Sequence, residues 1–338
     1  LSHLQKQGEV DLFKIKSGQE TTTLDRFFSH LKEADAAVIG PWYFPPMQPE
    51  HWQQAVNLKV FAGTFDNRFA NWADFDVLDK LDIKLIDTSR SMTSSVAEFA
   101  LAMTLNLIRD IPEALYVVRE GNWDQRFTSA FDVPGWKRKR PGFVHGDLTG
   151  RRVGLAGFGS INRRYAELIA PFRCKISVYD PFISDEVFSD YGVKRAKSLV
   201  ELAQSSEIFI VGIPPLSTTK EIINRDVISS LPKGSLFVLV TRMAVVEQQP
   251  LWERIKTNEI AAAIDVFAPE PPPASAWFRK HPNVQATPHI AGGTDFCHRR
   301  CFTDACKDAI SILNGEEPRF QATKRDYLLY EGKLDPLV

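Results

Sequence analysis

The sequence lacks an excess of charge of either sign and any long apolar segment, and each absence argues against a class of protein. Its 338 residues carry 41 basic and 42 acidic side chains, for a formal net charge of -1. This balance gives no electrostatic reason to expect nucleic acid or an anionic membrane as a partner. No apolar run approaches the roughly 18 residues of a membrane span, and the polar beginning LSHLQKQGEV has no signal-peptide core. We therefore expect a soluble cytoplasmic protein that binds neither nucleic acid nor a membrane.

Cysteine is also scarce, with four residues, too few for a disulfide framework in a chain of this length. Cys297, Cys301 and Cys306 fall in the segment DFCHRRCFTDACKDAISIL, beside His298. A metal site is one interpretation, but the spacings differ from the C-x2-C pairs of zinc sites. The segment has the pattern of an amphipathic helix, and cysteine is often buried. We therefore expect these thiols in a helix core and predict no metal.

Strand-like and helix-like segments alternate along most of the chain. Early segments typical of short strands are AAVIGPW (36–42), LKVFAGT (58–64) and IKLIDT (83–88). From residue 151, six more are RRVGLAG, KISVYD, EIFIVGI, SLFVLVT, AAAIDVF and NVQAT. Alternation of this kind predicts parallel sheets with helices on both faces, and the later six strands match a doubly wound dinucleotide-binding sheet. Residues 121–150 interrupt the alternation and contain KRKR, which we interpret as a solvated loop rather than a nuclear signal or phosphate patch.

The segment GLAGFGSINRR (154–164) nearly matches the phosphate-binding pattern G-x-G-x-x-G, with Gly157 and Gly159 in place and Asn162 in the third position. The helix expected after it has its apolar residues at positions 161, 165, 168 and 169. At such a strand-to-helix turn, backbone amides point toward a cofactor pyrophosphate. The amides concerned are those of Phe158, Ser160 and Ile161. Asn162 should push the helix outward or bury a polar side chain, without removing these amides.

The second strand of this region ends in Asp180, 23 residues after Gly157. An acidic residue about 20 positions after the loop accepts the ribose hydroxyls of NAD and repels the 2′-phosphate of NADP. An Asp-Pro pair can also simply start a turn, and the loop can be a structural turn that binds nothing. The series of six strands favours the binding of NAD.

Three polar residues follow the last strands: Arg242, Glu270 and His289. Ligands of open α/β sheets bind at the carboxyl ends of the strands, so the three side chains should face one crevice. Each also has a plainer interpretation, as a surface ion-pair partner, a loop residue or a buried core histidine. Their coincidence after three late strands favours catalysis.

With these residues, the sequence resembles the NAD-dependent D-2-hydroxyacid dehydrogenases. The similarity covers residues 94–294, and its segments run in the order of the family. They are VAEFALAMTLNLIRDIP, GFGSI, ISVYDP, IPPLSTTKEIIN, the Arg242 strand, AAIDVFAPEP and NVQATPHIAGGT. Two positions depart from the family pattern, which usually has Gly where Met243 stands and Asn where Leu239 stands. These departures, with Asn162, indicate a divergent branch.

The resemblance implies a role for each candidate residue. Arg242 would bind the carboxylate of a small 2-oxoacid or 2-hydroxyacid and polarise its carbonyl. His289 would exchange a proton with the substrate oxygen, and Glu270 would pair with His289 and favour the protonated ring. Further contacts to NAD would come from Pro214, Thr219, Thr241, Asp265 and Gly292, with Asp265 and the backbone near Thr241 at the carboxamide. Gly63 and Thr64 would supply amides to the substrate carboxylate.

The resemblance also implies the domain organisation and the assembly. A Rossmann cofactor domain (109–294) would be inserted into a flavodoxin-like substrate domain formed by residues 1–108 and 295–338, so both domains are α/β with doubly wound parallel sheets. Family members usually pair through the cofactor domain, so we expect a homodimer. Aromatic residues of the 121–147 segment would brace it: Trp123, Phe127, Phe131 and Trp136.

Two other functions stay open. A non-catalytic NAD(H)-responsive binding protein, related to corepressors, would bind NADH without turning over any 2-oxoacid. A hydrolase or lyase that uses bound NAD transiently would show no net change in NADH. A formate dehydrogenase would pair its histidine with glutamine, and Glu270 argues against that alternative.

Overall fold

The computed structural model describes residues 4–14, 20–40, 44–45, 47–65, 74–121, 123, 143–331 and 333–334. The chain divides into two compact units. The first unit combines Leu1–Thr93 with Gly293–Val338, and the inserted unit is Ser94–Gly292. The KRKR segment and the aromatic residues Phe127, Phe131 and Trp136 lie outside the described residues.

The inserted unit contains a seven-stranded sheet in the order β10-β9-β8-β7-β4-β5-β6, in which all neighbours pair in parallel. Six of its strands lie in the segments that the sequence predicts. The seventh, β6, has two residues and was not predicted. The bounds are β4 (Arg152–Ala156), β5 (Lys175–Tyr179), β6 (Lys194–Arg195), β7 (Ile208–Val211), β8 (Leu236–Leu239), β9 (Ala261–Ile264) and β10 (Val284–Ala286). The strand order reverses between β4 and β7, which is where such sheets bind ligands.

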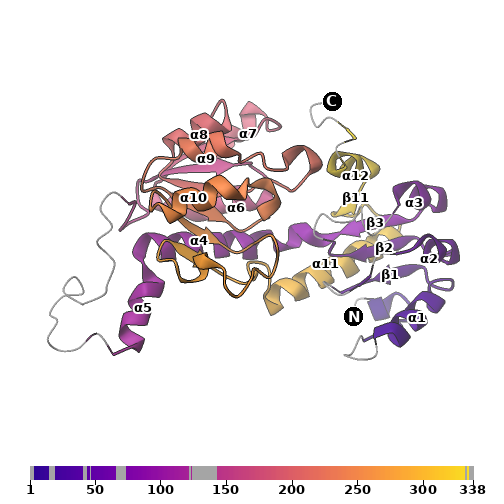
Figure 1. Cartoon of the computed structure of the whole chain (residues 1–338). Helices are drawn as coiled ribbons and strands as arrows, with labels where there is room; N and C mark the ends of the chain where they lie inside the picture. Colours follow the sequence, from indigo (N-terminus) through magenta and orange to yellow (C-terminus); the bar gives the residue numbers. More distant parts are fainter. Residues whose placement is uncertain are drawn as a thin grey trace. The chain divides into compact units, whose positions relative to one another are not determined.

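Both faces of this sheet are buried. Phe209 and Val211 of β7 join a core cluster with α8, α9 and α10, while Ile208 and Ile210 point to the opposite face and are equally buried. The helices of this unit, drawn in Figure 1, are α4 (Thr93–Arg109), α5 (Ile111–Arg119), α6 (Ser160–Ile169), α7 (Asp185–Asp190), α8 (Leu199–Ser205), α9 (Arg225–Ser230) and α10 (Gln248–Lys256). Short 3-10 turns are η5 (Ala170–Phe172), η6 (Ser217–Thr219), η7 (Met243–Val245) and η8 (Trp277–Lys280).

The first unit contains a four-stranded sheet in the order β1-β2-β3-β11. Strands β1 (Ala36–Val38), β2 (Val60–Gly63) and β3 (Lys84–Asp87) are parallel, and β11 (Gln321–Ala322) pairs antiparallel with β3. The helices are α1 (Glu20–His30), α2 (Pro49–Gln54), α3 (Phe75–Leu81), α11 (Asp295–Leu313) and α12 (Lys324–Tyr330), with 3-10 turns η1 (Leu4–Lys6) and η3 (Thr88–Met92). Phe61 of β2 packs in an aromatic cluster with Trp52, while Val60 and Ala62 face α11 on the other side. The predicted α/β class with two doubly wound units is therefore confirmed.

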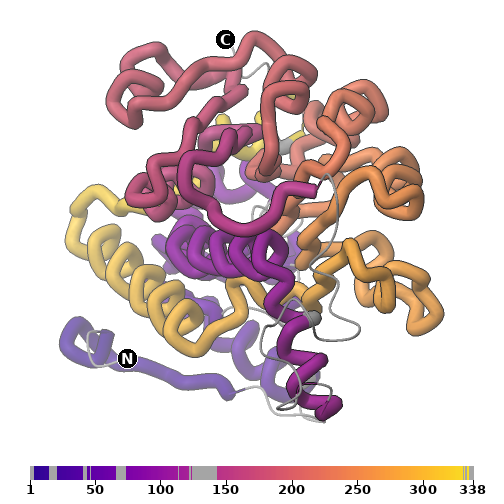
Figure 2. Tube along the Cα trace, turned by 90° about the vertical axis from the view of Figure 1, so that its left-hand side faces the viewer, coloured from indigo at the N-terminus to yellow at the C-terminus, as the bar shows by residue number. Residues whose placement is uncertain are grey.

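Helix α11 brings the C-terminal part of the chain back to the first unit. It lies beside the N-terminal segment (Figure 2), and Lys6 and Lys307 line the groove between them. Cys297, Cys301 and Cys306 are all buried in α11, which confirms the helix-core interpretation. Among the described residues, no group of His, Cys, Asp and Glu has the arrangement of a metal site.

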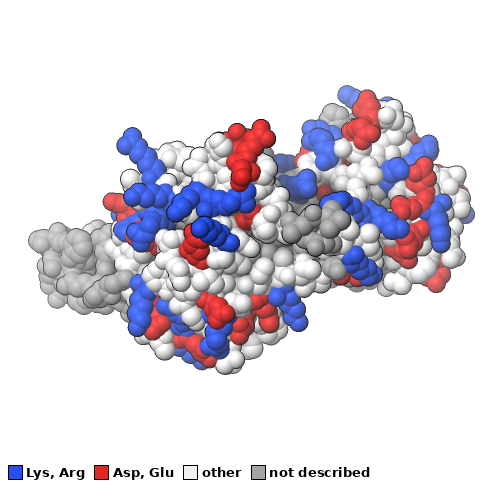
Figure 3. Space-filling view, turned by 90° about the horizontal axis from the view of Figure 1, so that it is seen from above, with Lys and Arg blue, Asp and Glu red and all other residues white. Residues whose placement is uncertain are grey.

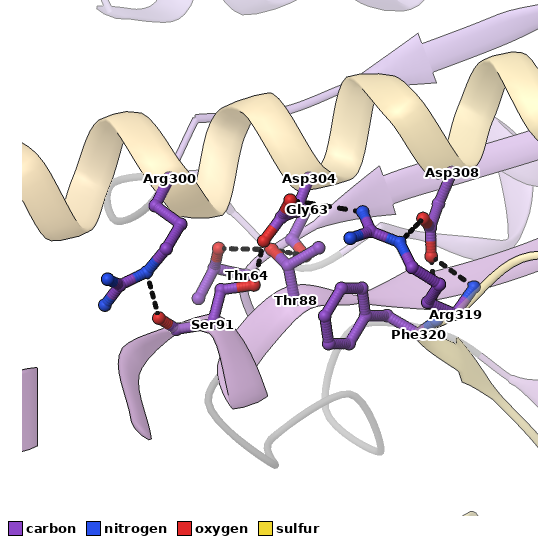
Figure 4. A network of polar contacts seen from close by, with 9 residues as sticks. All are labelled: Gly63, Thr64, Thr88, Ser91, Arg300, Asp304, Asp308, Arg319 and Phe320. Atoms are coloured by element: carbon purple, nitrogen blue, oxygen red, sulfur yellow. Dashed lines mark hydrogen bonds and ion pairs between the residues drawn. The ribbon is translucent and has the colours of Figure 1, made fainter. Parts of the chain in front are cut away.

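A polar network along one side of α11 ties it to η3 and to the start of β11 (Figure 4). Ser91 donates to Asp304 at 2.7 Å, and the backbone N–H groups of Arg319 and Phe320 donate to Asp308 at 2.8 and 2.7 Å. Asp308 is only 1% exposed. A buried carboxylate needs such donors, so this network specifies where the returning chain docks.

The surface carries charges of both signs. On the face seen in Figure 3, Lys and Arg side chains are interspersed with Asp and Glu, as the net charge of -1 suggests. Within the part of the chain that the structure describes, no helix is both long and apolar enough to span a bilayer.

Candidate active site

The glycine loop between β4 and α6 has an open backbone. Gly157 adopts a left-handed φ of 81°, and a Cβ there would lie 3.0 Å from the carbonyl oxygen of Gly212, so only glycine fits. A Cβ at Gly159 would meet no heavy atom within 4 Å. Helix α6 starts directly after Gly159, and its first intrahelical bond runs from Arg163 N–H to the Gly159 carbonyl. The first N–H groups of a helix have no acceptor within the helix, and they can bind phosphate. The loop and the start of α6 therefore fit the phosphates of a dinucleotide.

Asp180, just after β5, lies against this loop. Its Oδ2 accepts the Phe158 N–H at 2.7 Å, and its Oδ1 accepts the Phe182 N–H at 2.9 Å. The predicted proximity of loop and carboxylate is thus present. The Phe158 N–H, which the sequence analysis expects to face a pyrophosphate, instead donates to Asp180.

The sequence predicts that Asn162 either pushes the helix outward or buries its polar side chain, and the structure shows the side chain buried. It is 1% exposed, and its Nδ2 donates to the carbonyl oxygens of Gly157 at 2.7 Å and Ala156 at 3.3 Å. Space for the side chain comes from Gly212, just after β7, which has no Cβ at the point of contact.

The ends of β7 and β8 bring together three more candidate cofactor residues. The Thr219 hydroxyl donates to the carbonyl of Pro214, and the Thr241 hydroxyl donates to the carbonyl of Val211 at 3.2 Å. The Gly212 N–H donates to Ala156 at 2.8 Å, so these strand ends adjoin the glycine loop. Gly292, also a candidate, is the last residue of this unit in the sequence.

Arg242, His289 and Glu270 form a line of contacts beyond the carboxyl ends of β8, β10 and β9. Arg242 Nη1 lies 3.4 Å from His289 Nε2, and His289 Nδ1 lies 2.8 Å from Glu270 Oε2. Arg242 Nη1 also donates to the Thr241 carbonyl at 2.6 Å, which tethers the guanidinium. The side chains of His289 and Glu270 are 32% and 37% exposed, so a small ligand can reach them. The structure therefore brings together the three residues that the sequence places far apart.

Asp265 holds the turn that carries His289. It is fully buried, and its carboxylate accepts the hydroxyl of Thr287 at 2.6 Å and the N–H groups of Ile290 and Ala291 at 3.0 and 2.9 Å. The role predicted for Asp265 at the cofactor carboxamide stays a prediction. Thr287 was missed by the sequence analysis, since no motif marks a residue that acts through a buried carboxylate.

An aromatic stack supports the turn that carries Glu270. The N–H of Phe267 donates to Glu270 Oε1 at 3.3 Å. The ring of Phe267 stacks on Phe278 with centroids 5.2 Å apart, and Phe278 stacks on Trp252 at 4.9 Å. Stacked rings bury a large apolar area and resist rotation, so they restrict the loop on which Glu270 sits.

Gly63 and Thr64, the other predicted substrate residues, lie at the end of β2 in the first unit. The hydroxyls of Thr64 and Thr88 are 2.9 Å apart, and Thr88 donates to the Gly63 carbonyl at 3.0 Å (Figure 4). Both residues are buried, and their hydroxyls are used within this unit.

Comparison with known proteins finds a matching family. Residues 101–291 match the family of D-isomer specific 2-hydroxyacid dehydrogenases in its NAD binding domain. The glyoxylate reductase of Thermofilum pendens is 30% identical over 266 residues, which cover 78% of this chain and 74% of that protein. The D-3-phosphoglycerate dehydrogenase of Methanocaldococcus jannaschii is 27% identical over 317 residues, 93% of this chain and 55% of that protein.

A solved structure shares the fold of the chain. The apo D-mandelate dehydrogenase of Rhodotorula graminis has a TM-score of 0.77 at 22% identity, covering 96% of this chain and 93% of that one. At this identity the likeness shows the fold alone. This chain spans only part of the length of several curated relatives: 55% of the Methanocaldococcus jannaschii protein, and 61% and 43% of two proteins of Bacillus subtilis.

Proposed function

The chain belongs to the D-isomer-specific 2-hydroxyacid dehydrogenases, and we propose that it interconverts a small 2-oxoacid and the corresponding D-2-hydroxyacid. The line of contacts from Arg242 through His289 to Glu270 carries this proposal, with separations of 3.4 and 2.8 Å. It combines a fixed cation for a carboxylate, a proton-exchanging ring and an anion behind that ring.

The hydrogen bonds of His289 support Nε2 as the nitrogen that would exchange the proton. Arginine can only donate, so the Nε2 atom facing Arg242 is the acceptor, and the ring proton sits on Nδ1 toward Glu270. During oxidation of a hydroxyacid, Nε2 takes the hydroxyl proton; during reduction it returns a proton to the carbonyl oxygen. Glu270 balances the positive charge that the ring carries in between.

Arg242 is suited to orient the substrate. A planar guanidinium binds a carboxylate through two parallel hydrogen bonds, which also fixes the direction of the adjoining carbonyl. The bond from Arg242 to the Thr241 carbonyl limits the positions that the guanidinium can take. We propose that the backbone at Gly63 and Thr64 provides further donors to the same carboxylate.

The chemistry that NAD supplies when bound is transfer of a hydride to or from carbon 2 of the substrate. We propose that the backbone at Gly157, Gly159, Ser160 and Ile161 holds its phosphates and that Asp180 accepts its ribose hydroxyls. The remaining contacts would come from Pro214, Thr219, Thr241 and Gly292. In this arrangement Asp265, which is fully buried, would act through the turn that carries His289 rather than by touching the cofactor. The Phe158 N–H, which donates to Asp180, would not contact the phosphates.

We also propose that the protein forms a homodimer through α5. Four large apolar side chains of this helix are between 39% and 57% exposed: Ile111, Leu115, Tyr116 and Val118. Three of them, Ile111, Leu115 and Val118, recur at the spacing of one helical face. Trp123, just beyond the helix, is 59% exposed. An apolar stripe of this kind favours contact with a second copy.

The direct test is NADH oxidation with a panel of 2-oxoacids, comparing wild type with His289→Ala and Glu270→Gln. We expect turnover by the wild type and a loss of about 10²- to 10⁴-fold in kcat for His289→Ala, the range of general acid–base catalysis. Glu270→Gln should lower kcat more than it changes KM, because the amide can still accept the Nδ1 proton but carries no charge. The matched control is His30→Ala, an exposed histidine on α1, which should keep wild-type rates.

Each outcome is decisive. Activity that survives His289→Ala would remove His289 from the mechanism. Wild-type protein that binds NADH but reduces no 2-oxoacid would favour the non-catalytic binding protein instead.

A further inference from the structure

We infer that Asn162 is a positioning residue that pre-forms the phosphate loop, and that Gly212 is the glycine that makes room for it. The inference rests on the proposed binding of NAD by the inserted unit. It concerns this chain's own departure from the glycine pattern, in which Asn162 stands where a third glycine would allow close packing of helix on strand.

The peptide unit between Gly157 and Phe158 is held at both ends. Asn162 Nδ2 donates to its carbonyl oxygen at 2.7 Å, and Asp180 Oδ2 accepts its N–H at 2.7 Å. A peptide plane fixed through both of its polar groups cannot rotate without breaking two hydrogen bonds. The orientation of the loop is therefore set by side chains as well as by the φ preference of glycine.

The next peptide unit is held at its carbonyl end. Arg163, adjacent to Asn162 on α6, donates from Nε to the carbonyl oxygen of Phe158 at 2.8 Å. The Gly159 N–H belongs to that peptide unit, so its direction is set by the same bond. Two consecutive side chains of the first turn of α6 thus orient two consecutive peptide units of the loop.

Gly212 is the complement of Asn162. A Cβ added to Gly212 would lie at most 2.7 Å from three atoms of the Asn162 carboxamide, which no side-chain contact tolerates. On its other side the carboxamide is held by the carbonyls of Gly157 and Ala156. Asn162 and Gly212 are therefore a matched pair. The glycine that allows close packing stands at the end of β7 instead of on α6.

The geometry indicates that Asn162 acts on binding more than on stability. Its Oδ1 is buried and accepts no hydrogen bond from any described residue. An unpaired buried acceptor opposes folding, so removing the side chain takes away this cost together with the two hydrogen bonds that Nδ2 donates. What is lost without compensation is the order of the loop, which then has to be recovered when the cofactor binds.

The test measures dissociation constants for NADH and ADP-ribose, together with the melting temperature of the protein without ligand, in four variants. For Asn162→Ala we expect both constants to rise about 10-fold, equivalent to ~1.4 kcal/mol, with little change in melting temperature. The matched control is Asn283→Ala, which removes another buried asparagine of the same unit, 2% exposed and bonded to the Asn258 side chain at 2.9 Å. It should lower the melting temperature and leave both constants unchanged.

Two further variants, Gly212→Ala and the double variant Asn162→Gly/Gly212→Ala, distinguish the effect of the Asn162 hydrogen bonds on the loop from the effect of packing between Asn162 and Gly212. Gly212→Ala should weaken binding and lower the melting temperature, because the new methyl displaces the carboxamide. The double variant should recover the melting temperature but not the affinity for NADH and ADP-ribose, since the hydrogen bonds from Asn162 to the loop are still missing.

The inference is overturned if Asn162→Ala binds NADH within about twofold of wild type, if Asn283→Ala loses affinity equally, or if the double variant recovers full affinity. Should Asn162→Ala fail to fold, Gly212→Ala and the double variant decide the question by the same criteria. Wild-type protein that binds neither ligand would instead contradict the proposed function.

Discussion

His289 sits in the left-handed region of backbone conformation, with φ of 55°, and Asp265 holds it there. The carboxylate accepts Thr287 on one side of the histidine and Ile290 and Ala291 on the other. A non-glycine residue in this region costs roughly 1–2 kcal/mol, which these three bonds offset. The fully buried carboxylate of Asp265 therefore fixes the backbone from which the imidazole of His289 projects.

Asp265→Asn should lower kcat by about 100-fold, the loss that a displacement of roughly 1 Å at a catalytic group produces. An amide has one acceptor oxygen instead of two, so its NH₂ group would oppose either the Ala291 N–H or the Ile290 N–H. The Kd for NADH should change little, since the phosphate loop is untouched. Stopped-flow measurement of hydride transfer, beside a cofactor titration, checks both expectations.

The matched control is Asp308→Asn in the first unit. Asp308 is 1% exposed and likewise accepts two backbone N–H groups. This variant should lower stability but preserve the rate of hydride transfer in the folded protein. An unchanged kcat in Asp265→Asn would show that the turn of His289 keeps its shape without the carboxylate.

Glu207 predicts a pH dependence of stability. Burial alone would raise the pKa of Glu207, but hydrogen bonds from the Arg152 N–H at 2.9 Å and the Arg151 guanidinium at 3.0 Å outweigh it and lower the pKa. A depressed pKa in the folded state adds stability above the unfolded value, and this stability is lost as pH falls through the folded value. Glu207 therefore stabilises the inserted unit at neutral pH and ceases to do so in acid.

Glu207→Gln should cost about 2 kcal/mol at pH 7, which lowers the melting temperature by roughly 4–8 °C. The gap from wild type should narrow as the pH falls through the lowered pKa of Glu207, where the wild-type carboxyl becomes protonated. Melting curves from pH 3 to pH 8 measure it, with the exposed Glu186→Gln of α7 as the control. A gap of constant size across this range would contradict the linkage.

The buried thiols of α11 should be inert. Burial, and then the neighbouring Cys297, raise the pKa of Cys301 to about 12, and burial raises the pKa of Cys306. Only thiolates react with disulfide reagents, and at pH 8 a thiol of this pKa is ionised in about one molecule in 10⁴. We expect native protein to show at most one reactive thiol, the half-buried Cys174, and denatured protein to show four.

Cys174→Ser tests the assignment of that thiol and should remove any slow reaction in the native state. Metal analysis of the purified protein completes the measurement. Rapid modification of two or more thiols, or zinc bound in a one-to-one ratio, would contradict the helix-core interpretation.

The architecture follows from the sequence wherever strands have buried apolar runs. Central strands β7, β8 and β9 are buried at every position, and such runs stand out without any alignment. Strands β6 and β11 have two residues each and carry no period, so nothing in their composition marks them. These strands form because they pair with β5 and β3, and a local sequence pattern holds no information about such distant partners.

Helix α6 shows where hydrophobic pattern fails. The sequence assigns its core side to positions 161, 165, 168 and 169, whereas the buried residues are Asn162, Tyr165, Ala166 and Ile169. A scale of hydrophobicity cannot place an asparagine in a core, because its burial depends on acceptors supplied by the loop before it. The three residues Arg242, His289 and Glu270 were found because strand ends predict their meeting; Thr287 and Gly212 were not, because their contacts are with buried polar groups.

The assembly prediction concerns the exposed stripe of α5. Leu115 is 50% exposed and Val118 is 54% exposed. If a second copy covers them, Leu115→Glu with Val118→Glu would bury unpaired carboxylates, which costs several kcal/mol and separates the subunits. Light scattering should therefore give twice the chain mass of 38.2 kDa for wild type and the single mass for the variant. Leu81→Glu, which changes an apolar residue of α3 that is 37% exposed, is the control and should keep the wild-type mass. If the wild-type protein has the mass of a single chain at micromolar concentration, the proposed homodimer through α5 is wrong.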